Sequence, residues 1–242
     1  MTRNNYVFSV EGNIGSGKST LIPQLKKILI YFEKNNFRYN VVYLTEPVKD
    51  WESIKDENGK NIIQNFYENN EKYAFSFQIM AYISRINQIK TILKNCYNTI
   101  IICERSIFTD KWVFAKMLYD SKNIEEINYQ IYLKWFDEFH KEIPYKGIIY
   151  VKTTPETCLN RIKQRNRSGE NIPINYLETC DNYHDNWIYN LSTFPIVVFN
   201  GEINIENTEK YKESLIYNVI PFISKNIKTP SKIKSISEFY GC

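Results

Sequence analysis

A complete phosphate-binding loop lies close to the start of the chain and constrains what the chain can fold into. Residues 11–20 read Glu-Gly-Asn-Ile-Gly-Ser-Gly-Lys-Ser-Thr, which matches the pattern G-x-x-x-x-G-K-S. An apolar run at residues 6–10 precedes the loop, and apolar residues at helical spacing follow it. Strand, glycine loop and helix therefore come in the order that a nucleoside-triphosphate site requires. We expect the phosphates to be bound by Gly12, Asn13, Ile14, Gly15, Ser16, Gly17, Lys18, Ser19 and Thr20.

Two side chains of this loop have specific expected roles. Lys18 is expected to reach the β- and γ-phosphates, and the Ser19 hydroxyl to bind Mg²⁺. The start of the following helix adds the positive end of its dipole. A chance glycine-rich turn is the alternative, and the flanking strand and helix patterns argue against it. ATP and Mg²⁺ are therefore the expected cofactors.

The apolar pattern beyond the loop predicts an α/β fold. Short apolar runs that read as strands occupy residues 7–10, 41–44, 99–103, 148–151 and 196–199. Helical patterns separate them, the longest at about residues 72–95, 128–142 and 209–224. This alternation is typical of a five-stranded parallel sheet with helices on both faces, as in the P-loop kinase fold. The 242 residues fit one domain, expected over residues 1–225, followed by a polar tail at 226–242.

Charge and composition exclude several classes of partner. The net charge is only +4 and the basic residues are spread out, which argues against a nucleic-acid groove. No stretch is apolar enough to span a bilayer, and because the first predicted strand comes so early we expect no targeting peptide. The five cysteines have no metal-binding spacing, so we expect free thiols and a cytoplasmic protein. The long helices carry more apolar residues than one face needs, which favours a homodimer.

Acidic residues follow two of the predicted strands, where ligands bind in parallel sheets. Glu46 and Pro47 come after the second strand, and Glu104-Arg105-Ser106 after the third. Glu46 is placed to accept the proton of an attacking hydroxyl, Glu104 to hold Mg²⁺ through water, and Arg105 to hold Glu46 or the hydroxyl. Solvated strand-end charges are the alternative interpretation of these positions.

The helix predicted at residues 72–95 has one unusual face. Phe77, Gln78, Ala81 and Arg85 share it at helical spacing. A helix that only packs would not combine Gln and Arg with Ala and Phe. A pocket for a flat heterocycle would, because the Gln amide both donates and accepts while Phe77 stacks and Ala81 leaves room.

An arginine-rich segment lies in the second half of the chain. Arg161, Arg165 and Arg167 precede Ile172-Pro173. The spacing fits a lid at about residues 161–173 that closes over the transferring phosphate and neutralises its charge. A solvated basic face is the alternative.

Taken together, these motifs resemble the deoxyribonucleoside kinase family, which contains the deoxycytidine, deoxyguanosine and mitochondrial thymidine kinases. The resemblance runs from the first strand to at least Trp187. It implies that Glu46, Arg105 and Lys18 are catalytic, with Glu46 as the base for the 5′-hydroxyl. Ser19 and Glu104 match the Mg²⁺ positions. Besides the phosphate loop, the resemblance rests on Glu46-Pro47, Trp51, Phe77-Gln78, Ser84-Arg85, Glu104-Arg105-Ser106, residues 154–159, the arginine-rich segment, Ile172-Pro173 and Tyr176-Leu177.

The resemblance also implies a nucleoside site and a base preference. Family members that act on deoxycytidine and purine deoxynucleosides resemble this chain in having Arg and Asp at the positions of Arg85 and Asp110. Asp110 can accept from an exocyclic amine, whereas thymine offers a carbonyl and a methyl group there. We therefore expect deoxycytidine, deoxyadenosine or deoxyguanosine, in no fixed order, to be favoured over thymidine. The implied substrate-binding residues are Glu46, Trp51, Ile63, Phe66, Tyr67, Phe77, Gln78, Ala81, Arg85, Arg105, Asp110, Phe114 and Glu170.

Two other functions stay open from the sequence. A nucleoside monophosphate kinase of the thymidylate kinase type shares the loop and the sheet, but it needs cations for the acceptor phosphate, and Glu46-Pro47 has no adjacent Arg. A non-catalytic kinase-like subunit is disfavoured because all the expected catalytic and metal-binding residues are intact, namely Lys18, Ser19, Glu46, Glu104 and Arg105.

Overall fold

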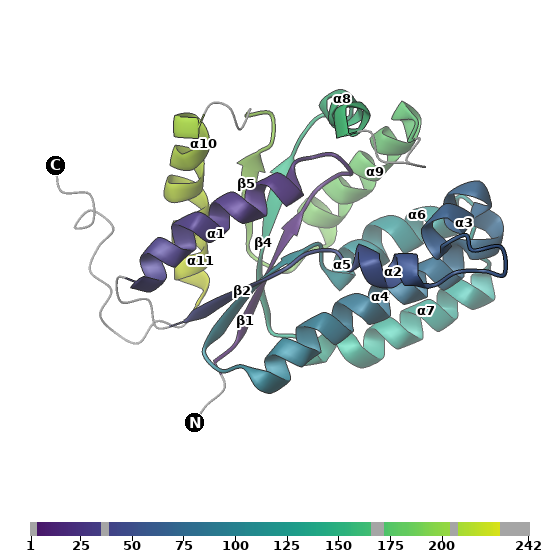
Figure 1. Ribbon diagram of the computed structural model, residues 1–242, viewed down its shortest axis with the longest axis horizontal. Coiled ribbons are helices and arrows are strands. Elements are labelled where there is room, and N and C mark those ends of the chain that lie inside the picture. Colours follow the sequence, from purple (N-terminus) through teal and green to yellow (C-terminus); the bar gives the residue numbers. More distant parts are fainter. Residues whose placement is uncertain (1–3, 35–38, 166–171, 204–207, 228–242) are drawn as a thin grey trace.

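The computed structural model describes residues 4–34, 39–165, 172–203 and 208–227. Its centre is one five-stranded sheet in the order β2-β3-β1-β4-β5, with every neighbouring pair parallel (Figure 1). This confirms the predicted sheet and its five strands. The strands are β1 (Tyr6–Glu11), β2 (Asn40–Leu44), β3 (Thr99–Glu104), β4 (Tyr145–Lys152) and β5 (Ile196–Asn200).

Strand register brings the predicted site residues to one edge of the sheet. In the central strand, Val10 pairs with Glu104 of β3, and Glu11 pairs with Tyr150 of β4. All residues of β1 and β3 are buried. Since parallel strands end on the same side, the phosphate loop after β1 and the segment after β2 that holds Glu46 meet Glu104 at this carboxyl edge.

One face of the sheet is covered by α1 (Lys18–Lys34) and the C-terminal helices (Figure 1). α10 (Thr208–Ser214) and α11 (Ile220–Asn226) are joined by a π-helical segment, Leu215–Val219. The helix predicted at 209–224 is therefore present with a π segment in its middle. The core on this face includes Phe8, Leu21, Leu25, Leu215 and Ile220.

The other face is covered by α4 (Asn70–Asn95) and α7 (Glu126–Phe139). A second core lies there, in which Tyr132 of α7 shares a cluster with Val7 and Ile101 of the sheet. Both helices begin two residues before their predicted starts. For α4 the reason is a cap, because the Asn69 side chain accepts from the Lys72 N–H at 3.0 Å. The shorter elements on this side are α5 (Ile107–Thr109), a π-helical segment at Asp110–Ala115, α6 (Lys116–Asp120), a 3₁₀ turn at His140–Glu142, α9 (Ile174–Asn186) and a π-helical segment at Trp187–Leu191.

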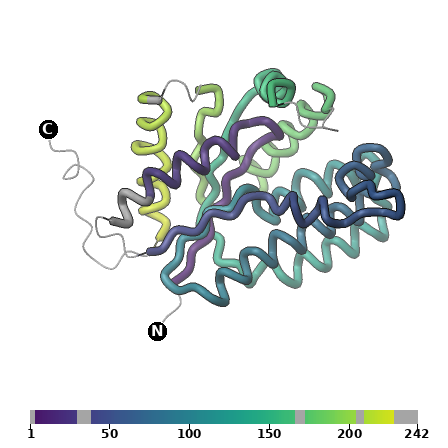
Figure 2. The backbone as a smooth tube through the Cα atoms, in the orientation of Figure 1, coloured from purple at the N-terminus to yellow at the C-terminus, as the bar shows by residue number. Residues whose placement is uncertain are grey.

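Three further helices position site residues beyond the sheet. α2 (Val48–Ser53) and α3 (Ile62–Glu68) follow β2 and pack against α4, as the path of the chain in Figure 2 shows. α3 begins with a capping box between Asn61 and Gln64. α8 (Pro155–Arg165) follows β4, and its last residues, 161–165, form the first part of the predicted lid.

Some predictions fall outside the described residues. Residues 166–171 of the predicted lid and residues 228–242 of the predicted tail belong to this part. The division into a domain and a tail therefore stays a prediction. Among the described helices, none combines the length and the apolar character needed to cross a membrane.

Candidate active site

The phosphate loop has a shape that only glycine permits at two positions. Gly12 has φ +142°, and a Cβ there would lie 2.5 Å from the Val151 carbonyl oxygen. Gly15 has φ +78°, and its Cβ would lie 2.6 Å from the Cys158 carbonyl oxygen. The loop thus lies directly against β4 and α8. Because α1 begins at Lys18, the first N–H groups of this helix have no acceptor within the helix and can bind an anion.

Lys18 is held inside the loop. Its Nζ donates to the carbonyl oxygens of Gly12 at 3.1 Å and Asn13 at 2.7 Å, and the side chain is only 5% exposed. Burial lowers the pKa of Lys18 to about 7, and the charge of Arg105 adds to this effect. The amine is therefore close to losing its proton until a negative group approaches.

Ser19 and Glu104 place two potential metal-ligand oxygens beside the loop. The Ser19 hydroxyl donates to Glu104 Oε1 at 2.7 Å, and Glu104 is buried. Hydroxyl and carboxylate oxygens are ligands that Mg²⁺ accepts, usually together with substrate phosphates and water. The part of the chain that the structure describes holds no cluster of three or more His, Cys, Asp or Glu side chains suited to a metal. The pair thus fits a magnesium ion that is shared with bound phosphates.

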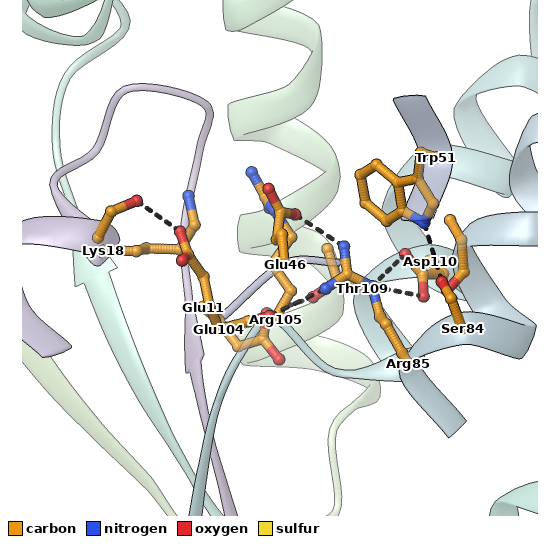
Figure 3. A network of polar contacts seen from close by, with 12 residues as sticks. Glu11, Lys18, Glu46, Trp51, Ser84, Arg85, Glu104, Arg105, Thr109 and Asp110 are labelled. Atoms are coloured by element: carbon orange, nitrogen blue, oxygen red, sulfur yellow. Dashed lines mark hydrogen bonds and ion pairs between the residues drawn. The ribbon is translucent and has the colours of Figure 1, made fainter. Parts of the chain in front are cut away.

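Glu46 lies between two guanidinium groups (Figure 3). Its Oε1 accepts from Arg85 Nη2 at 2.7 Å and lies 3.0 Å from Arg105 Nε. Burial would raise the pKa of Glu46, but the charges of Arg85 and Arg105 outweigh it and lower the pKa to about 2. The carboxylate is therefore ionised and oriented at the carboxyl edge. The sequence predicted the contact with Arg105 and missed the contact with Arg85.

Arg105 connects Glu46 to the phosphate loop. Its backbone is in the left-handed region with φ +63°, which costs a non-glycine residue roughly 1–2 kcal/mol. Its N–H donates to the Val10 carbonyl at 3.0 Å, and its Nη1 donates to the Gly12 carbonyl at 2.9 Å. The guanidinium also lies 4.9 Å from the centre of the Phe114 ring. These contacts hold a strained residue in one orientation.

Arg85 links three parts of the site. Its Nε lies 3.1 Å from Asp110 Oδ2 and 3.3 Å from Oδ1, and its Nη1 donates to the Glu104 carbonyl at 2.9 Å. The structure thus brings together Arg85 and Asp110, which the resemblance assigned to one nucleoside site. Burial raises the pKa of Asp110 to about 6, although the charge of Arg85 opposes this. At neutral pH the carboxylate is ionised.

An aromatic cluster lies beside this network. Trp51 and Phe77 meet edge to face at 5.4 Å, and Phe66 lies 4.8 Å from Phe77. Two buried acceptors lack a hydrogen bond from the described residues: Gln78 Oε1, and Asp110 Oδ2, whose contact with Arg85 Nε at 3.1 Å is an ion pair. Buried acceptors without donors are costly, so a ligand with N–H groups fits here.

The remaining predicted residues take different positions. Ala81 and Ile63 belong to the same apolar cluster as Trp51. Ile14 packs beside the loop, against a cluster that includes Cys158 and Leu177. Tyr67 is 40% exposed next to Phe66, with ring centres 5.4 Å apart.

The lid arginines are only partly described. Arg161 donates to the carbonyl oxygens of Ser16 at 3.1 Å and Gly201 at 2.8 Å, so it lies on the phosphate loop. Arg165 is exposed at the end of α8. Arg167 and Glu170 lie outside the described residues.

Two buried residues of the site were missed from the sequence. Glu11, at the end of β1, is fully buried and accepts a hydrogen bond from the Thr109 hydroxyl. His184 of α9 is also fully buried and approaches Arg105 Nη1 at 3.5 Å. For Glu11 a signal was available, since an acidic residue directly before a phosphate loop is at the floor of the site. For His184 no local pattern marked the contact.

Comparison with known proteins identifies relatives over most of the chain. A family model described as deoxynucleoside kinase matches residues 8–224. Human deoxycytidine kinase is 35% identical over 89% of this chain and 90% of the human protein. Deoxycytidine kinase 1 of Xenopus laevis is 34% identical over 89% of both chains. The mitochondrial deoxyguanosine kinase of the same species is 28% identical over 89% of both chains.

Proposed function

Because the chain belongs to the deoxynucleoside kinase family, we propose that it transfers the γ-phosphoryl group of ATP to the 5′-hydroxyl of a deoxyribonucleoside with an amino-bearing base. Phosphorylation of a deoxynucleoside by a kinase follows from the family. The donor, the metal and the base preference are proposed from the site.

The observation that carries the proposal is the position of Glu46 between Arg85 and Arg105. In the proposed reaction, Glu46 takes the proton of the 5′-hydroxyl as its oxygen attacks the γ-phosphorus. A carboxylate with a pKa of about 2 is a weak base in the resting state. The hydroxyl becomes acidic only as the bond to phosphorus forms, so a held carboxylate acts mainly by orienting the nucleophile and accepting its proton late.

The phosphate groups are proposed to bind between the loop and α8. Lys18 and the N–H groups at the start of α1 would contact the β- and γ-phosphates, and Arg161 lies on the same loop. Arg165 and Arg167 are proposed to close over the transferring group. Ser19 and Glu104 are the residues that would hold Mg²⁺, which supplies neutralisation of the developing phosphate charge.

The base preference rests on the buried acceptors Gln78 Oε1 and Asp110 Oδ2. An exocyclic amine of cytosine, adenine or guanine supplies the missing donor. Thymine would place a carbonyl opposite Asp110, so the carboxylate would keep only its ion pair with Arg85 and face an acceptor. The cost is about 1–3 kcal/mol, which corresponds to roughly 5- to 150-fold discrimination.

The proposed assembly is a homodimer through α7. Ile127, Ile131 and Trp135 follow one another at four-residue spacing and are 71%, 40% and 48% exposed. Such a stripe is typical of a helix that packs against another helix. Trp135→Glu should convert the dimer to a monomer in sedimentation, whereas Tyr217→Glu, at an apolar residue 68% exposed in the Leu215–Val219 segment, should not. Equal masses for both variants would contradict an α7 interface.

The cellular location is proposed from the thiols. Cys96, Cys103, Cys158 and Cys180 are free. Free cysteines at this density are typical of a reducing compartment, so the cytoplasm is the proposed location.

The substrate is tested by offering several acceptors side by side with ATP and Mg²⁺: deoxycytidine, deoxyadenosine, deoxyguanosine, thymidine and deoxycytidine monophosphate. Turnover of the amino-bearing nucleosides with thymidine poor is the expected result. Thymidine as the best acceptor would overturn the base preference and leave the enzyme class intact. Turnover of the monophosphate alone would favour a nucleoside monophosphate kinase.

A further inference from the structure

His184 is a buried side chain that the proposed reaction does not yet use. It lies on α9 and is fully buried. Its ring lies nearly parallel to that of Tyr150 on β4, at 10° and 6.4 Å, and meets Phe114 edge-on at 6.3 Å. The imidazole is therefore held between the sheet and the segment that follows α5.

The hydrogen bonds of His184 fix where its proton lies. Nδ1 is 2.7 Å from the Cys180 carbonyl oxygen. A carbonyl can only accept, so Nδ1 carries the proton. Burial lowers the pKa of His184 well below its ordinary value, and the charge of Arg105 lowers it further. The ring is neutral, and Nε2 presents a lone pair.

That lone pair faces Arg105. Nε2 lies 3.5 Å from Arg105 Nη1, which carries two protons and gives one to the Gly12 carbonyl at 2.9 Å. His184 can accept the other. Since the guanidinium is planar and rigid, two acceptors at Nη1 set the direction in which Nε points, and Nε lies 3.0 Å from Glu46.

We propose that His184 is a positioning residue that orients Arg105, and through Arg105 the carboxylate of Glu46. The inference rests on the proposed function, in which Glu46 acts on the 5′-hydroxyl. His184 itself would contact neither the nucleoside nor ATP. Replacing it should therefore change kcat and leave the KM values nearly unchanged.

A matched pair of polar variants separates positioning from packing. In His184→Gln the longer amide can donate to the Cys180 carbonyl and still reach Arg105 with its oxygen. In His184→Asn the amide is one methylene shorter and cannot reach Arg105. Per folded molecule, His184→Asn should lower kcat about ten- to hundred-fold with both KM values changed by less than about three-fold. His184→Gln should keep kcat within about three-fold of the wild type.

A neighbouring variant controls for lost stability. Tyr150→Phe removes the hydroxyl that donates to Asp185 at 2.7 Å and keeps the ring beside His184. It should lower the melting temperature and leave kcat unchanged. In addition, His184→Asn should lower kcat little when combined with Arg105→Lys, because lysine lacks the rigid fork that His184 orients.

The outcomes distinguish this inference from the proposed function. A wild-type enzyme that phosphorylates no nucleoside would overturn the proposed function. An active wild type with equal kcat for His184→Asn and His184→Gln would overturn the positioning role alone. Additive losses in the combination with Arg105→Lys would overturn it as well.

Discussion

Arg85 Nη2 lies 2.7 Å from Glu46 Oε1, while Nε of the same guanidinium lies 3.1 Å from Asp110 Oδ2. One side chain therefore contacts both the proposed general base and the carboxylate proposed to select the nucleobase. In the proposed mechanism, base recognition and phosphoryl transfer are therefore coupled through Arg85, and a substitution made to change specificity should also change kcat.

The first prediction concerns this coupling. Arg85→Met combined with Asp110→Ala should raise the kcat/KM ratio of thymidine over deoxycytidine by roughly ten-fold or more, because the buried acceptor is gone. The same variant should lower kcat for every nucleoside, because Glu46 loses one of its two cations.

Asp110→Asn is the matched control, since it keeps Arg85 beside Glu46. It should raise the kcat/KM ratio of thymidine over deoxycytidine, with a smaller loss of kcat than the double variant shows. Unchanged ratios in both variants would refute the proposed role of Asp110, and equal losses of kcat would refute the coupling.

A second prediction follows from the raised pKa of Asp110, which is about 6 because burial disfavours the charged form. Above this pH the carboxylate only accepts hydrogen bonds. Below it the protonated acid can also donate, and a donor suits the thymine carbonyl. The kcat/KM ratio of thymidine over deoxycytidine should therefore rise as the pH falls from about 7.5 to about 5.5. Glu46 stays ionised throughout this range, given its pKa of about 2.

Competition between the two nucleosides in one reaction measures this ratio directly, and effects common to both substrates cancel. In Asp110→Asn the ratio should no longer depend on pH. A pH dependence that persists in this variant would assign the effect to another group.

The sequence predicts those parts of the fold that are encoded by patterns within a short stretch of the chain. All five strands were predicted because each is a short run of mostly apolar residues, such as Ile100, Ile101 and Ile102 in β3. The start of α4 was placed two residues late, because the Asn69 cap depends on backbone geometry and not on the apolar pattern.

The candidate site was predictable where motifs are contiguous. The phosphate loop and the Glu46-Pro47 and Glu104-Arg105-Ser106 motifs lead directly to the residues that meet at the carboxyl edge. The contacts of Arg85 with Glu46 and of His184 with Arg105 join residues 39 and 79 positions apart. No local pattern carries such contacts, because they arise from the packing of α4 and α9 against the sheet.

The third prediction concerns Lys18, whose pKa is lowered to about 7 by burial. At about pH 8 most of the free enzyme should carry a neutral Lys18, and the phosphates of ATP should restore its charge. Binding of ATP should therefore take up as much as about one proton at pH 8 and much less at pH 6. Calorimetry in buffers of different ionisation enthalpy measures this uptake.

Lys18→Arg provides the comparison, because arginine stays protonated at both values of pH. Subtracting the proton uptake measured for Lys18→Arg from that of the wild type removes the protons that ATP itself gains or loses on binding. Equal uptake by the wild type and Lys18→Arg would show that the proton goes to another group.

The central claim, that Glu46 is the general base held by Arg85 and Arg105, is tested most directly by turnover of Glu46→Gln. The amide keeps an oxygen for both arginines but cannot take the proton of the 5′-hydroxyl. We predict that kcat falls by about 10²–10⁴-fold while ATP affinity stays within about three-fold of the wild type. Near-normal turnover of Glu46→Gln, with ATP bound equally well, would contradict the account.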